Sequence, residues 1–196
     1  MSKTDEMRQI KDEVLNLKTS PLYKYRTDNK YFPVIGEGSH DAEIMFVGEA
    51  PGKTEATTGR PFCGAAGKVL DQLLGHIGLD RKSVYITNIV KDRPPGNRDP
   101  LPDEIEVYSK FLDRQIEIIQ PKIIATLGRH SMKYIMGKFG LSNQLKSISQ
   151  CHGLSYGAKT NYGDIKIATL YHPAVGVYNN HQIPMLKKDF EILKHM

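Results

Sequence analysis

The stretch IMFVGEAPG, residues 44–52, is the segment around which the rest of the chain is organised. Its apolar start is typical of a short buried strand, and the residues that follow are typical of a tight turn. Glu49 stands where the strand ends. Because open α/β sheets bind ligands beyond the carboxyl ends of their strands, we expect Glu49 to face a ligand crevice.

The composition is that of a soluble globular protein. The chain has 196 residues, of which 39% are hydrophobic and 25% charged, enough for one domain with a sizeable core. No apolar run approaches the roughly 18 residues of a membrane span, and residues 1–6 lack the pattern of a secretory signal. We therefore expect a cytoplasmic protein, and the net charge of +5 favours a polyanionic partner.

The two cysteines, Cys63 and Cys151, lie far apart, and the chain contains no CxxC motif. A zinc or iron–sulfur site needs three or four soft ligands, so we expect no metal site. Each cysteine is expected to be a buried free thiol.

The pattern of apolar residues predicts alternating strands and helices. Strands are expected at residues 43–48, 83–90, 123–127 and 165–170. Helices are expected at residues 5–17, 65–77, 103–119, 129–136 and 184–194. Loops are expected from the end of the first helix to residue 41, at 93–102, which contain four prolines, and at 140–163, with a weak hairpin in the last.

The predicted strands are apolar almost throughout, which indicates a parallel sheet covered by helices on both faces. The sequence therefore predicts a single α/β domain over residues 1–196, with an N-terminal helix within residues 1–20. The expected architecture is a three-layer α/β/α sandwich around a four-stranded parallel sheet.

Three polar residues stand at the ends of predicted strands: Glu49, Asn88 and His172. Since parallel strands end at the same edge of a sheet, we expect these side chains to converge there. Each also has a simpler interpretation: Asn88 can satisfy backbone groups at a corner, and His172 can be a capping or core histidine. Phe62, which follows the first strand, can be a core aromatic residue.

Several separate blocks of the chain match one family in order and spacing, from about residue 20 to the C-terminus. The blocks are GEAPG (48–52) with Glu55, GRPF (59–62), GAAG (64–67), VYITN (84–88), Lys91, RPPGNR (93–98), Pro121-Lys122, Leu127-Gly128 and HPA (172–174). Taken together they resemble the family 4 uracil-DNA glycosylases. The resemblance implies the same three-layer fold around a four-stranded parallel sheet.

The resemblance also implies a role for each pocket residue. Phe62 is expected to stack on the flipped uracil, and Asn88 to read its polar edge. Glu49 is expected to help position the base and the attacking water, and His172 to stabilise the negative charge of the departing base. Three further residues are expected to contact the substrate: Gly48, Ala50 and Glu55. Family 1 enzymes have a catalytic Asp at the position of Ala50, so strong general-base help is not expected here.

Two segments are expected to bind DNA. Lys91, Arg93 and Arg98 belong to a proline-stiffened loop beside the sheet edge and are natural phosphate ligands. A solvated turn is the simpler interpretation of this loop. The segment that begins with Ala174 and Val175 follows His172 and is expected to wedge into the duplex where the base has left.

One departure from the family is large. The family binds a [4Fe–4S] cluster through four cysteines, and this chain has Leu17, Ser20, Asp92 and Tyr108 at the corresponding positions. We therefore expect no cluster and no other cofactor. Leu17 and Tyr108 are expected to pack in its place.

The expected function is that of a monofunctional hydrolase, a monomer that excises uracil from DNA and leaves an abasic site for base excision repair. Its partner is uracil-containing DNA, with no role for a membrane. Two alternatives stand beside it. The first is a catalytically silent DNA-binding module of a replication or repair assembly. The second is a glycosylase for another deaminated base, such as hypoxanthine.

Overall fold

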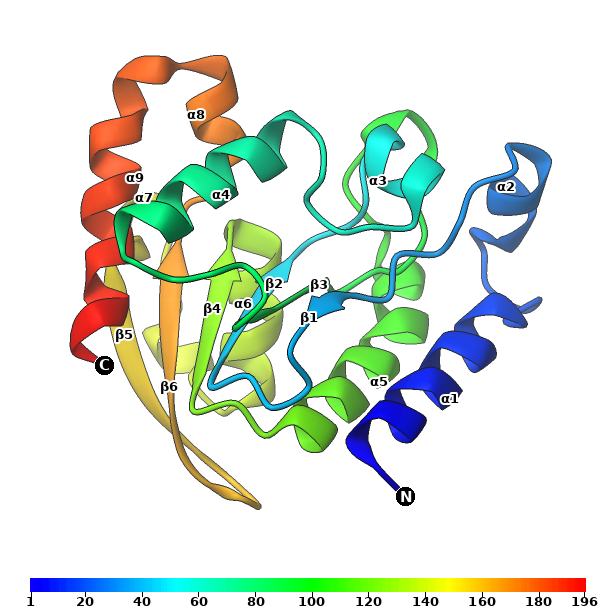
Figure 1. Ribbon diagram of the computed structural model, residues 1–196, viewed down its shortest axis with the longest axis horizontal. Coiled ribbons are helices and arrows are strands. Elements are labelled where there is room, and N and C mark those ends of the chain that lie inside the picture. The colour runs from blue at the N-terminus through cyan, green and yellow to red at the C-terminus, as the bar shows by residue number, and fades with distance from the viewer.

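The computed structural model describes residues 1–196 and has one six-stranded mixed sheet (Figure 1). The strands are β1 (Glu37–Gly38), β2 (Ile44–Gly48), β3 (Tyr85–Asn88), β4 (Ile123–Leu127), β5 (Leu154–Thr160) and β6 (Gly163–Leu170). Their order across the sheet is β1-β3-β2-β4-β6-β5. The four central strands are parallel, as the sequence predicts.

Both edge strands are antiparallel to their neighbours and depart from the sequence-based expectation. β1 lies within the segment for which the sequence predicts a loop, and β5 forms a long hairpin with β6 where the sequence predicts only a weak one. β5 is largely exposed, so it lacks the apolar run that identified the central strands. β3 is shorter than the predicted strand at residues 83–90.

Helices cover both faces of the sheet. The α-helices are α1 (Lys3–Leu15), α2 (Tyr23–Asp28), α3 (Lys53–Thr58), α4 (Ala65–His76), α5 (Pro102–Ile119), α6 (Arg129–Lys138), α7 (Ile148–Cys151), α8 (Ala174–Tyr178) and α9 (Ile183–Phe190). Short 3₁₀ turns are η1 (Pro95–Asn97), η2 (Ser142–Gln144), η3 (Asn180–Gln182) and η4 (Glu191–His195). No helix has the length and apolar character needed to cross a membrane.

The core consists of two apolar clusters, one on each face of the sheet. Successive strand residues point to opposite faces, so Met45 and Val47 of β2 join the cluster under α1, α5 and α6, whereas Phe46 joins the cluster under α4 and α9. Phe46 stacks on Phe190 of α9, with ring centroids 5.9 Å apart. The three-layer arrangement is therefore confirmed, and it directs the carboxyl ends of all four parallel strands to one edge.

Candidate active site

A cavity of about 230 Å³ opens at the carboxyl edge of the parallel strands. This volume lies below the roughly 300–1,000 Å³ of pockets for drug-sized ligands, so the cavity suits a small group. Its lining comes from the segments after β2, β3 and β6: Glu49, Ala50, Pro51, Gly52, Glu55, Phe62, Ala66, Asn88, Pro94, Asn97, Arg98, His172 and Ala174. The strand-end residues that the sequence singled out thus meet in one cavity.

Phe62 lies in the cavity wall and has a strained backbone conformation, which the contacts around it maintain. Its φ of 46° lies in the left-handed region, which is uncommon for a bulky residue. The carboxylate of Glu55 accepts hydrogen bonds from the backbone N–H groups of Cys63, at 3.0 Å, and Gly64, at 2.8 Å. Gly67 packs closely behind, since a Cβ there would lie 1.9 Å from the carbonyl oxygen of Phe62. Glu55 therefore supports the turn that presents Phe62.

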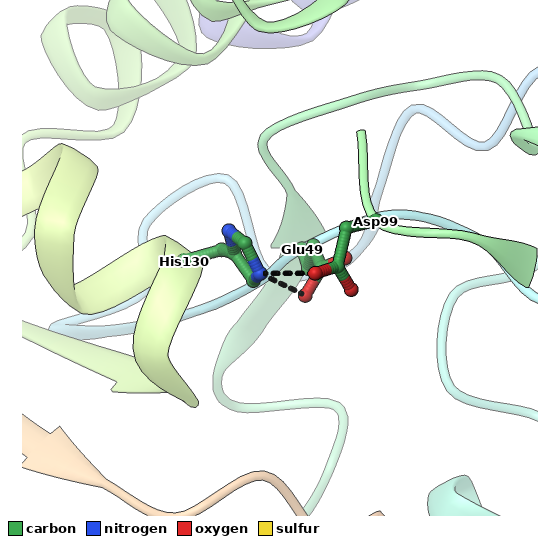
Figure 2. Close-up of side chains that lie close together, drawn as sticks. All are labelled: Glu49, Asp99 and His130. Atoms are coloured by element: carbon green, nitrogen blue, oxygen red, sulfur yellow. Dashed lines mark ion pairs between the residues drawn. The ribbon is translucent and has the colours of Figure 1, made fainter. Parts of the chain in front are cut away.

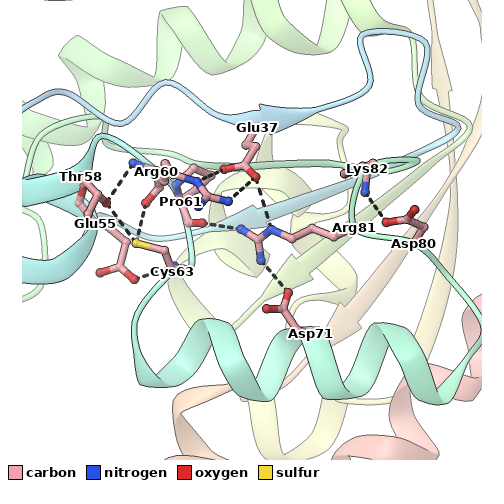
Figure 3. A network of polar contacts seen from close by, with 10 residues as sticks. All are labelled: Glu37, Glu55, Thr58, Arg60, Pro61, Cys63, Asp71, Asp80, Arg81 and Lys82. Carbon is pink, nitrogen blue, oxygen red and sulfur yellow. Dashed lines mark hydrogen bonds and ion pairs between the residues drawn. The ribbon is translucent and has the colours of Figure 1, made fainter.

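A second set of contacts anchors the same turn from outside (Figure 3). Glu37 of β1 accepts two hydrogen bonds from the guanidinium of Arg60, at 2.9 and 2.8 Å. Arg81 donates to the carbonyl oxygen of Pro61, at 2.5 Å, and pairs with Asp71 of α4, at 2.8 Å. The unexpected strand β1 thus contributes directly to the position of the Phe62 turn.

Gly48 shapes the site without lining it. A Cβ at this position would lie 2.3 Å from Asn88 Oδ1 and 2.7 Å from Phe62 Cζ. Distances this short are forbidden by steric overlap. Only glycine therefore lets Asn88 and Phe62 approach each other across the end of β2.

Asn88 is 2% exposed, and its Oδ1 atom is buried without a hydrogen-bond partner. A buried unpaired acceptor costs about 1–3 kcal/mol, and such atoms in native proteins call for an explanation. The simpler interpretation, in which the side chain satisfies backbone groups, does not account for this atom. An unpaired acceptor in a cavity wall is suited to a ligand that carries a hydrogen-bond donor.

Lys91 corrects a sequence-based prediction. Its side chain is fully buried, and Nζ donates to Thr87 Oγ1 at 2.8 Å, the Asn88 carbonyl oxygen at 2.7 Å and Gln115 Oε1 at 2.6 Å. Burial lowers the pKa of Lys91 well below its usual value. Lys91 is therefore an internal support of the end of β3, and its enclosed ammonium group is not accessible to a DNA phosphate.

Arg93 also turns inward. Its Nε donates to Asn97 Oδ1 at 2.6 Å, and its Nη1 donates to the hydroxyls of Tyr31 at 2.9 Å and Tyr25 at 3.2 Å. Arg93 therefore stabilises its own loop through these contacts, whereas the sequence predicts that it binds phosphate. Arg98 is exposed and lines the cavity, while its guanidinium pairs with Glu104, at 2.6 Å.

His172 lines the same cavity and lies beside Phe62, with ring centroids 5.6 Å apart. Its Nδ1 accepts a hydrogen bond from the backbone N–H of Ala174, at 3.1 Å. Desolvation lowers the pKa of His172 to about 4, so the imidazole is neutral near pH 7. In a neutral ring whose Nδ1 is an acceptor, Nε2 carries the hydrogen and is free to donate. Val175, by contrast, does not line the cavity.

Glu49 lies in a group of titratable side chains with Asp99 and His130, two residues that the sequence analysis does not single out (Figure 2). His130 Nε2 lies 3.7 Å from Glu49 Oε2 and 3.2 Å from Asp99 Oδ2. Arg129 donates to His130 Nε2 at 3.0 Å and to Asp99 at 2.6 Å. The pKa of Glu49 is raised above its usual value. Desolvation is the main cause and Asp99 adds to it, whereas the contacts with His130 and Arg129 oppose the shift. The sequence signal for His130 is its place in the first turn of α6, which follows β4 at the same sheet edge.

Neither metal chemistry nor a cluster is favoured by the donors present. Glu49, Asp99 and His130 are close enough to bind a metal ion, but Arg129 already engages two of them. At the positions of the family's cluster cysteines, Leu17 offers no donor, and Ser20, Asp92 and Tyr108 bond to one another rather than presenting thiolates. These residues do not fit an iron–sulfur cluster. Tyr108 lies in the apolar core and Leu17 packs against the same cluster, as expected, and the Tyr108 hydroxyl is also hydrogen-bonded.

Comparison with known proteins identifies a family model and several similar proteins that match this chain. Residues 35–194 match the family model described as the uracil DNA glycosylase superfamily. A type-4 uracil-DNA glycosylase of Sulfurisphaera tokodaii is 49% identical over 98% of this chain and 85% of its own length. Those of Saccharolobus solfataricus and Archaeoglobus fulgidus are 44% and 41% identical, over 97% and 95% of this chain and 86% and 89% of their own lengths.

Proposed function

The chain belongs to the uracil-DNA glycosylase superfamily, and from this we propose that it hydrolyses the N-glycosidic bond of uracil in DNA and leaves an abasic site for base excision repair. Its target is inaccessible inside a duplex, so the base must be flipped into the cavity, at a cost of a few kcal/mol. The observation that carries the proposal is the bare, buried Oδ1 of Asn88 beside the ring of Phe62.

Base recognition follows from the chemistry of an amide. Asn88 Oδ1 accepts the N3–H of uracil, and its NH₂ group donates to O4. Cytosine presents the opposite pattern at both atoms, which leaves buried polar groups unpaired and is strongly disfavoured. Phe62 stacks on the face of the base, which contributes about 1–3 kcal/mol by analogy with other base–aromatic contacts.

Bond cleavage leaves an anionic base and a cationic sugar. The electrons of the broken C1′–N1 bond pass to the uracil ring, and the charge that develops at O2 is stabilised by the Nε2–H of neutral His172. Water adds to C1′ and loses a proton, which neutralises the departing uracil anion. Ionised Glu49 orients this water and favours the positive sugar. Position 50 is Ala, so no further carboxylate acts there as a general base.

DNA contacts are assigned to exposed groups around the cavity. Arg98 lines the cavity and is the remaining phosphate ligand of the proline-rich loop. In α8, which begins at Ala174, Tyr178 is 89% exposed and Val177 40% exposed. Exposed apolar side chains of this kind suit a wedge that fills the space left by the flipped base. We further propose that the protein acts as a monomer in the cytoplasm.

We infer that the enzyme needs no iron–sulfur cluster, because the four positions lack thiolates. Purified protein is expected to contain no stoichiometric iron and still to cleave single-stranded and duplex oligonucleotides that carry one uracil, after alkali treatment. Folded protein that leaves these strands intact would refute the proposed activity. DNA binding without cleavage would favour a silent module, and a preference for hypoxanthine over uracil would favour another deaminated base.

A further inference from the structure

A buried hydrogen-bond network joins three parts of the chain that lie far apart in sequence. Ser20 precedes α2, Asp92 follows β3, and Tyr108 lies in α5. Ser20 Oγ lies 2.6 Å from the Tyr108 hydroxyl, which donates to Asp92 Oδ2. Arg26 of α2 donates to both carboxylate oxygens of Asp92, at 3.2 and 3.1 Å.

Every group in this network has a partner, and the direction of each hydrogen bond is fixed. The hydroxyl of Tyr108 donates to Asp92, so Ser20 Oγ must donate to Tyr108, while Ser20 Oγ accepts the backbone N–H of Leu22 at 3.1 Å. The four side chains are at most 6% exposed. Burial raises the pKa of the Asp92 carboxyl, and the contacts with Tyr108 and Arg26 lower it.

Arg26 also fastens the first helix. Its guanidinium donates to the carbonyl oxygens of Val14, at 3.0 Å, and Leu15, at 2.7 Å, at the C-terminal end of α1. Carbonyls in the last turn lack the usual helical partners, although that of Val14 also accepts the backbone N–H of Leu17 at 3.3 Å. A cation is favourable at this end of a helix. The network therefore ties α1, α2 and α5 to a single carboxylate, that of Asp92.

Asp92 opens the loop that reaches the active site. Pro94, Asn97 and Arg98 of this loop line the cavity. The neighbouring Arg93 donates to the hydroxyls of Tyr25 and Tyr31. The segment that contains α2 therefore contacts the loop at two successive residues, Asp92 and Arg93. A buried ion pair contributes little net stability, because desolvation offsets the attraction, but breaking one partner leaves an uncompensated charge. The buried pair of Arg26 and Asp92 therefore contributes more to the position of the loop than to the stability of the fold.

We propose that Arg26 and Tyr108, whose hydroxyl Ser20 orients, hold Asp92 and so position the loop of residues 92–98 for DNA, the task that cluster ligation at the positions of Ser20, Asp92 and Tyr108 would otherwise perform. On this proposal, a hydrogen-bond network takes the place that an iron–sulfur cluster would occupy, which explains why these residues do not fit a cluster. The kinetic part of the test rests on the proposed uracil excision, whereas the exchange part does not.

The test uses two variants that each remove one hydroxyl. Tyr108→Phe deprives Asp92 of a partner, whereas Ser20→Ala leaves Asp92 with both of its partners. We expect amide hydrogen exchange in residues 92–98 to accelerate about ten-fold in Tyr108→Phe and less than about two-fold in Ser20→Ala, since local opening reflects the lost contacts. Glu13→Gln is the control, because Glu13 pairs with Arg114 and also joins α1 to α5 without touching the loop.

Kinetics distinguish positioning from simple stabilisation. In Tyr108→Phe, the KM for uracil-containing DNA is expected to rise about ten-fold while the single-turnover rate at saturating enzyme stays within about two-fold. The double variant Asp92→Asn/Tyr108→Phe is expected to have a KM no higher than that of the more impaired single variant, because the two residues act as one unit. Unchanged exchange in residues 92–98 of folded Tyr108→Phe, or equal exchange in the two hydroxyl variants, would overturn the proposal, even if wild-type protein excises uracil.

Discussion

Replacing Asn88 with alanine is expected to separate activity from stability. The side chain is 2% exposed, and its Oδ1 is buried without a partner. Removing that atom relieves an unpaired acceptor that costs about 1–3 kcal/mol. The deletion also leaves a small void in the cavity wall, which costs a similar amount. The two effects oppose each other, so the free energy of unfolding should change by less than about 1 kcal/mol.

The effect on catalysis has no such compensation. Asn88→Ala removes both hydrogen bonds to the base and leaves its N3–H and O4 without protein partners. At about 3–5 kcal/mol for the pair in a desolvated site, kcat/KM for uracil excision should fall about 10²- to 10⁴-fold. The preference for uracil over cytosine should fall with it.

Two measurements on the same preparations test this reasoning. Single-turnover cleavage of an oligonucleotide with one uracil gives the activity, and urea denaturation gives the stability. Asn143→Ala is the matched control, because Asn143 is exposed in η2 and should change neither quantity. A loss of more than about 3 kcal/mol of stability would mean that Asn88 is structural. Activity within about five-fold of the wild type would mean that Asn88 does not read the base.

Three further predictions follow from the same geometry. Gly48→Ala places a Cβ 2.3 Å from Asn88 Oδ1 and should lower single-turnover excision at least about 100-fold, as misplacement by about 1 Å does elsewhere; near-normal activity would contradict the steric argument. Lys91→Met should leave the salt dependence of DNA binding unchanged, whereas Arg98→Ala should reduce the slope of log K against log salt by about one, measured by fluorescence anisotropy. Asp99 raises the pKa of Glu49, so Asp99→Asn should lower that pKa and move the acidic limb of the excision rate to lower pH, because Glu49 acts ionised; a limb at higher pH would be the wrong sign.

The core of the site was predictable from the sequence. Glu49, Asn88 and His172 each follow an apolar run, and the parallel-sheet rule alone brings such strand ends to one edge. The roles of these residues and of Phe62 came from the family resemblance, since periodicity does not identify a ligand. The function of Gly48 was not predictable, because its effect depends on two side chains from other elements that meet above it.

The loop charges show where sequence reasoning failed. The sequence predicts that Lys91 and Arg93 bind phosphates because both are cations of a proline-stiffened loop beside the sheet edge. In the structure three acceptors enclose the ammonium of Lys91, and two tyrosine hydroxyls and Asn97 hold the guanidinium of Arg93. No local pattern marks such partners, because they come from other elements.

The sequence by itself determined the alternation of apolar strands and amphipathic helices, the shared edge of the parallel strands and the absence of cluster cysteines. These features depend on residue type and short-range periodicity, which are complete in the sequence. Only the tertiary structure decided that Ser20, Arg26, Asp92 and Tyr108 bond to one another, since up to 88 residues separate the partners. Contacts of that range depend on how the helices pack on the sheet, and the direction of a side chain is fixed only when packing is complete.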